Sequence, residues 1–194
     1  MLREPTKIVH ELAADQHGYF TTEQAREAGV DHRTLAMMCR RGTVAREAQG
    51  LYRDPLIPAT RWGPYMAAVL WPKGVQGVLS HETALNLFEL SDVNPGQIHV
   101  TVPKGHRTRR QPPPAYRLHR ADIPRADTTT HEGLPVTTVA RTLKDCHSAH
   151  IGPALIRQAL GDARRLGYLA PIEAEVLERE LLQAPSDASG ARGD

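Results

Sequence analysis

The sequence predicts an α+β protein of two domains, and three kinds of pattern support this fold class. Apolar residues three and four positions apart predict amphipathic helices, the first over residues 6–15. Apolar and polar residues alternate over 98–102 and 116–120, which is typical of strands. Residues suited to capping helices stand where several of the predicted helices begin. A chain of 194 residues, 40% of them hydrophobic, has enough apolar material for one or two packed cores.

The first domain is predicted from residues 18–53, which indicate a helix, a tight turn, a second helix and a hairpin. Thr21 and Gln24 form a capping-box pattern at the start of the first of these helices. Gly29 suits the left-handed position at which that helix ends, and Asp31 can cap the next one. The inward stripe of the second helix is then Leu35, Met38 and Cys39.

A short two-stranded wing is predicted directly after the second helix, which ends at Gly42. Residues 44–48 and 51–53 form its strands, and Gln49-Gly50 forms the turn between them. Helix, turn, helix and wing, in this order, define the winged helix-turn-helix, which lays its second helix in the DNA major groove.

The outward face of that second helix is predicted to contact DNA. Arg33 and Arg40 on this face can bond guanine O6 and N7 or phosphate oxygens. The predicted DNA-binding residues are Thr22, His32, Arg33, Thr34, Met37, Arg40, Arg41, Thr43 and Arg46. The alternative is that these are solvated charges on a small helical module with a structural or protein-binding role.

A mixed α/β domain is predicted to follow a linker at residues 54–58. Its helices are expected at 62–71, 81–90, 138–146, 153–166 and 171–182, and its strands at 78–79, 98–102, 116–120 and 134–136. Ser80 and either Thr137 or Thr138 are expected to cap helices. The predicted domains are therefore residues 1–57 and 60–183, followed by a disordered tail at 184–194.

The distribution of charge is more informative than the net charge of +2. No acidic residue occurs between Val93 and Ala121, where six cations are found: Lys104, Arg107, Arg109, Arg110, Arg117 and Arg120. The segment from Lys104 to Arg120, called the basic loop below, is stiffened by three consecutive prolines and could be a second DNA contact or a dock for an acidic partner. A solvated loop between two strands is the third interpretation.

No enzymatic, metal-binding or membrane function is predicted. Two cysteines make no disulfide framework, and the spacing of the six histidines between His99 and His150 supports no metal site. Ser80-His81-Glu82 resembles a catalytic constellation only in its letters, because adjacent helical residues point in different directions. There is no phosphate-binding glycine loop, no signal peptide, and no apolar run of the ~18 residues that a membrane helix needs. We therefore expect a cytoplasmic protein without a cofactor or catalytic residue.

Five segments together resemble the AbiEi family of antitoxins: GYFTTEQAREAGVDHRTL, RRGTVAREAQGLYR, VLSHETALNLFEL, IHVTVP and GLPVTTVARTLKDC. The resemblance spans residues 18–146. It implies an N-terminal winged helix-turn-helix that binds inverted repeats in its own promoter and represses the operon. It also implies a C-terminal domain that neutralises a nucleotidyltransferase-like toxin encoded alongside, and DNA contacts by Arg33, Arg40, Arg41 and Arg46.

The resemblance leaves several alternatives open. The protein could bind its operator as monomers or as a weak dimer, cooperatively on DNA. A stand-alone regulator, or an antitoxin that promotes phosphorylation of its toxin, are alternative functions. Similar N-terminal halves also occur in proteins that continue into a Vsr-like endonuclease. The residues after Cys146 contain glutamates on a predicted helix and lack the carboxylate pattern needed to hold two metal ions, so we do not expect a nuclease.

Overall fold

The computed structural model describes residues 4–107 and 110–183. The chain divides into two compact units, one formed by residues up to Leu79 together with Gly96–Thr137, the other by Ser80–Pro95 together with the residues from Thr138 onward. This division differs from the domain boundary placed near residue 58 on sequence grounds, because the N-terminal elements and the strands that follow belong to one unit. The tail predicted at 184–194 lies outside the described residues.

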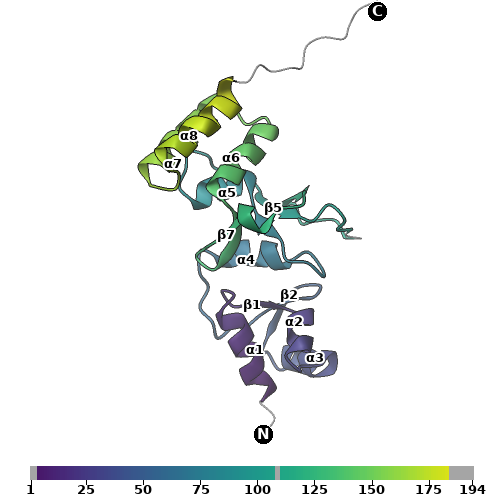
Figure 1. Cartoon of the computed structure of the whole chain (residues 1–194). Helices are drawn as coiled ribbons and strands as arrows, with labels where there is room; N and C mark the ends of the chain where they lie inside the picture. Colours follow the sequence, from purple (N-terminus) through teal and green to yellow (C-terminus); the bar gives the residue numbers. More distant parts are fainter. Residues whose placement is uncertain (1–3, 108–109, 184–194) are drawn as a thin grey trace, which may run out of the picture. The chain divides into compact units, whose positions relative to one another are not determined.

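The first unit begins with α1 (Pro5–Ala14), β1 (Tyr19–Thr21), α2 (Thr22–Glu27) and α3 (His32–Arg40), followed by β2 (Ala45–Ala48) and β3 (Leu51–Arg53) (Figure 1). The three strands form an antiparallel sheet in the order β1-β3-β2. The predicted helices and hairpin are therefore present. The segment before α2, expected only as an extended entry, is the third strand of the sheet.

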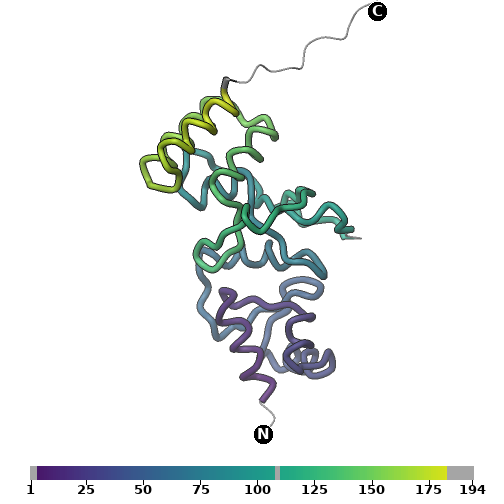
Figure 2. Tube along the Cα trace, in the orientation of Figure 1, coloured from purple at the N-terminus to yellow at the C-terminus, as the bar shows by residue number. Residues whose placement is uncertain are grey.

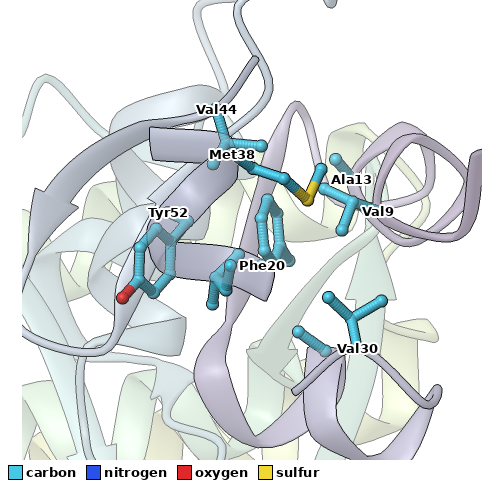
Figure 3. Packing of buried hydrophobic residues seen from close by; sticks show 9 residues of the cluster. Val9, Ala13, Phe20, Val30, Met38, Val44 and Tyr52 are labelled. Atoms are coloured by element: carbon cyan, nitrogen blue, oxygen red, sulfur yellow. The ribbon is translucent and has the colours of Figure 1, made fainter. Parts of the chain in front are cut away.

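Apolar side chains from every one of these helices and strands except β2 meet in one core, part of which is shown in Figure 3. Its buried residues are Val9, Ala13, Phe20, Ala25, Val30, Leu35, Met38, Val44 and Tyr52. Phe20 is fully buried and stacks on Tyr52 of β3, with the ring centroids 5.7 Å apart. This stacked pair joins β1 to β3 beneath the helices.

The same unit contains a five-stranded sheet made of β4 (Val78–Leu79), β5 (Ile98–Val102), β6 (Tyr116–Arg120), β7 (Thr128–His131) and β8 (Leu134–Thr137). The strand order is β6-β5-β4-β8-β7. The β5–β6 and β4–β8 pairs are parallel, and the other two pairs are antiparallel. Helix α4 (Gly63–Leu70) contacts β1, β4, β5 and β8, so it links the two sheets.

Two connections in this sheet matter for function. β7 was not predicted, because Thr-Thr-Thr-His carries no apolar alternation; it pairs with β8 through a tight turn in which Glu132 and Gly133 both have positive φ. The connection between β5 and β6 is a long excursion away from the sheet (Figure 2). It contains most of the basic loop.

Among its described residues the second unit contains helices and no strand: α5 (His81–Leu87), α6 (Val139–Ser148), α7 (Pro153–Arg165), α8 (Pro171–Glu178) and a π-helical segment, η2 (Arg179–Gln183). Thr138 caps α6 by accepting the Arg141 backbone N–H at 3.4 Å. With the two sheets of the first unit, these helices confirm the α+β class. No helix within the described ranges has the length and apolar character needed to span a bilayer.

Replacing Phe20 with alanine is expected to destabilise the protein by about 3–5 kcal/mol, because removal of the ring leaves a cavity between β1 and β3. Urea unfolding measures the change. Leu56→Ala is the control: Leu56 is 73% exposed, and its truncation is expected to change stability by no more than about 0.5 kcal/mol. Equal effects of the two substitutions would contradict this account of the core.

Candidate nucleic-acid interface

Hydrogen bonds at the N-terminus of α3 set the direction in which this helix begins. Gly29 in the left-handed region ends the α2 turn, and Val30 donates its N–H to the Ala25 carbonyl at 2.8 Å. The Asp31 carboxylate then accepts the Thr34 backbone N–H at 2.7 Å, which caps α3 as predicted. These hydrogen bonds from Thr34 lower the pKa of Asp31 below its ordinary value, so the cap is ionised at neutral pH.

The outward face of α3 carries two solvent-facing arginines. Leu35 and Met38 are buried, which turns the opposite side, with Arg33 and Arg40, to solvent. Among the described residues neither arginine forms an ion pair. They are seven positions apart, or about 10 Å along the helix axis, which corresponds to about three base-pair steps. Met37 is 36% exposed on the same face.

Further polar groups surround this face. Arg41 is exposed at the C-cap of α3, and His32 is exposed in its first turn. Arg46 of β2 is paired in register with Tyr52. Burial raises the pKa of the Cys39 thiol, and the nearby positive charge of Arg46 offsets part of this rise. The wing therefore places one more cation beside α3.

The three threonines among the predicted DNA-binding residues are half-buried. Thr22 donates its backbone N–H to the Gly50 carbonyl at 3.0 Å, so it holds the turn of the wing. Thr34 and Thr43 use their backbone N–H groups to bond Asp31 and the Met38 carbonyl. The backbone N–H of each is already occupied, and the Asp31 carboxylate also accepts a hydrogen bond from the Thr34 side chain, so the hydroxyls of Thr22 and Thr43 are the groups left for DNA.

The described cations of the basic loop do not form one continuous surface. Lys104 and Arg107 are exposed, whereas Arg109 lies outside the described residues. Arg117 and Arg120 both belong to β6, but their positions differ by an odd number, so they face opposite sides of the sheet. Cations that are close together in the sequence are thus separated in space, because side chains alternate between the two faces of β6.

Arg110 is half-buried and anchors the wing. Its guanidinium donates to the Gln49 carbonyl at 2.6 Å and to the Trp71 carbonyl at 3.1 Å. It also lies over the Trp71 ring, 5.0 Å from the centroid. The loop between β5 and β6 is therefore tied both to the turn of the wing and to the end of α4.

A second attachment joins the N-terminal elements to the five-stranded sheet. The His17 imidazole, just before β1, lies 2.8 Å from the Glu132 carbonyl in the β7–β8 turn and 3.3 Å from the Thr60 hydroxyl. Tyr19 packs against Gly63 at the start of α4. The winged helix-turn-helix is thus held at its wing and at the entry to β1.

Two histidines of the first unit meet, although twenty positions separate them in the sequence. The His119 Nε2 and His99 Nδ1 atoms are 3.3 Å apart, and the ring centroids are 5.1 Å apart. Burial is the largest cause that lowers the pKa of each imidazole to about 4; the Arg117 charge adds to the effect at His99, and at His119 the charges of His99 and Arg117 add to it. Both imidazoles are therefore neutral at pH 7. The spacing of histidines along the sequence did not predict this pair.

The second unit contains one departure from the expected chemistry. Ser80 occupies the N-cap position of α5, but its hydroxyl makes no capping hydrogen bond and instead lies 2.9 Å from His81 Nδ1. The expectation that Ser80 caps the helix, and that these adjacent side chains diverge, was wrong. Ser80 precedes the helix and His81 has a left-handed backbone (φ 53°), which brings the two side chains together.

The order of elements, the β1-β3-β2 sheet and the cationic outer face of α3 define the class of a winged helix-turn-helix protein. Residues 7–53 match the family described as "Transcriptional regulator, AbiEi antitoxin". This match confirms the resemblance to AbiEi antitoxins for the N-terminal region. No curated protein matches the sequence.

A solved structure supports the fold of nearly the whole chain. The crystal structure of the RV2827C protein from Mycobacterium tuberculosis is similar with a TM-score of 0.51 and 18% sequence identity. The match covers 89% of this chain and 70% of that one. At this level of identity, the similarity concerns the fold alone.

Replacing Arg110 with alanine is expected to loosen the wing, because the substitution removes a charged donor bonded to the Gln49 carbonyl. Hydrogen exchange of residues 45–53 should accelerate, while exchange in α1 stays unchanged. Arg107→Ala removes the same charge from an exposed position of the loop and is the control. Similar exchange in both variants would show that Arg110 does not hold the wing.

Proposed function

We propose that this protein is a DNA-binding antitoxin that represses its own operon and neutralises a nucleotidyltransferase-like toxin encoded beside it. The observation that carries the proposal is the pair of exposed arginines, Arg33 and Arg40, on α3 of a region that matches the AbiEi regulators. A cytoplasmic location agrees with both tasks.

Operator recognition would use α3 as the recognition helix. Arg33 and Arg40 are spaced to contact bases or phosphates about three base pairs apart, since each residue advances the helix by about 1.5 Å. Arg41 and Arg46 at the edges of this surface suit phosphate contacts, which fix the register of the helix but carry no sequence information. Inverted repeats would then receive two copies of the protein, as monomers or as a weak dimer, with cooperative binding.

Neutralisation of the toxin would belong to the rest of the chain. The basic residues Lys104 and Arg107 are exposed and remain available for an acidic partner or a second DNA contact. Arg110 is a poor candidate for either, because its guanidinium already bonds two carbonyl groups. A stand-alone regulator would replace this proposal if coexpression with the toxin gives no growth rescue. An antitoxin that promotes phosphorylation of its toxin would replace it if the silenced toxin is phosphorylated.

The double variant Arg33→Ala/Arg40→Ala is expected to weaken operator binding and to flatten its salt dependence by about one log-log unit for each phosphate that the protein no longer neutralises. Fluorescence anisotropy with promoter DNA at several salt concentrations measures both effects. Arg157→Ala/Arg164→Ala removes the same charge from exposed positions of α7 and is the matched control. Operator affinity that is unchanged in the first variant would remove α3 from the interface.

Coexpression with the adjacent reading frame tests the antitoxin role. The intact protein and the Arg33→Ala/Arg40→Ala variant are both expected to restore growth, because toxin neutralisation does not use the α3 surface. Mass spectrometry of the silenced toxin distinguishes the mechanisms: an unmodified toxin supports neutralisation by binding, and a phosphorylated toxin supports covalent modification. Absence of growth rescue would leave the stand-alone regulator as the better description.

A further inference from the structure

We propose that His99 and His119 bind a transition-metal ion, with Zn²⁺ as the best match to their chemistry. The pair lies on β5 and β6, which run parallel with His99 opposite Arg117 and Thr101 opposite His119. Because side chains alternate along a strand, all four of these residues lie on one face of the sheet. This inference uses residues outside the DNA-binding region and does not depend on the proposed function.

The separation of the two nitrogens fits a shared ion. Zinc binds imidazole nitrogen at about 2.0–2.1 Å with tetrahedral geometry, which places two such ligands about 3.3–3.4 Å apart. His99 Nδ1 and His119 Nε2 are 3.3 Å apart. Hydrogen bonds to an N–H donor are most often about 2.9–3.0 Å long, so this spacing is longer than a typical direct bond.

The protonation state of the pair also suits a metal. A histidine must be neutral to donate a lone pair to a metal ion. His99 is buried and His119 is half-buried, and burial favours the neutral form of an imidazole.

One neighbouring charge opposes a cation at this place. Arg117 lies opposite His99 in the β5–β6 register and on the same face of the sheet, so its positive charge repels a dication bound to the pair. Arg117 is exposed, so solvent reduces this repulsion. Substituting Arg117 therefore tests for a bound ion while both imidazoles stay in place.

The consequence for the fold would be a clip between β5 and β6. Within the five-stranded sheet β6 is an edge strand, with β5 as its neighbour. β5 and β6 pair in register over five residues, but the segment that connects them is the long basic loop, which adds little restraint to this pairing. An ion held by one side chain from each strand would stabilise this edge and fix both ends of the loop.

The experiment uses the full, tag-free chain, stripped of metal and titrated with ZnCl₂ and CoCl₂. We expect one ion per chain by calorimetry, a rise in the melting temperature, and a Co²⁺ absorption spectrum that indicates nitrogen ligands. His99→Ala and His119→Ala should each weaken binding by at least about tenfold, since even groups that only support a ligand contribute that much. His147→Ala, an exposed histidine of α6, is the control and should bind normally.

A further variant guards against failure of folding in the histidine variants. Arg117→Ala keeps both imidazoles and is expected to bind Zn²⁺ more tightly than the parent at low ionic strength, because it removes the opposing charge. The proposal is overturned if the parent binds no ion with 1:1 stoichiometry, or if binding survives both histidine substitutions. Unchanged affinity in Arg117→Ala would also contradict an ion at this pair.

Discussion

The packing of Leu35 and Met38 of α3 against the N-terminal core is the interaction on which the DNA-binding surface depends. These two side chains occupy the inner side of a short helix, so the positions opposite them, Arg33 and Arg40, must face solvent. The core itself is completed by Phe20 and Tyr52 from the sheet beneath. The orientation of the arginines is thus a consequence of hydrophobic burial and needs no contact made by the arginines themselves.

The small sheet under α3 is too short to be rigid alone, and the structure supplies two restraints from outside it. Strands of three or four residues make few backbone hydrogen bonds, and isolated hairpins are marginal in water. Arg110 holds the turn of the wing through the Gln49 carbonyl, and His17 binds the Glu132 carbonyl of the β7–β8 turn. The wing and the five-stranded sheet therefore restrain each other.

Sequence reasoning predicted the elements whose local patterns are strong and missed what arises from tertiary contacts. The capping box at Thr21 and the cap at Asp31 were found because capping depends on residues only three positions apart. β7 was missed because its four residues owe their conformation to pairing with β8. Arg110 was grouped with the other loop cations, since charge alone does not reveal that two carbonyls are its partners. The proximity of His99 and His119 likewise depends on the register of β5 and β6, which the sequence between the two strands does not reveal.

These interactions indicate a structural role for the connection between β5 and β6, whereas its basic composition suggests a binding role. One end of that connection follows a buried strand, and the other leads into an edge strand; between them Arg110 reaches the wing. An ion at His99 and His119 would hold the strands from which the loop emerges, and Arg110 would then transmit a fixed loop position to Gln49. The charge of this loop resembles that of a DNA-binding patch, but its main role would then be structural: it would set the position of the wing beside α3.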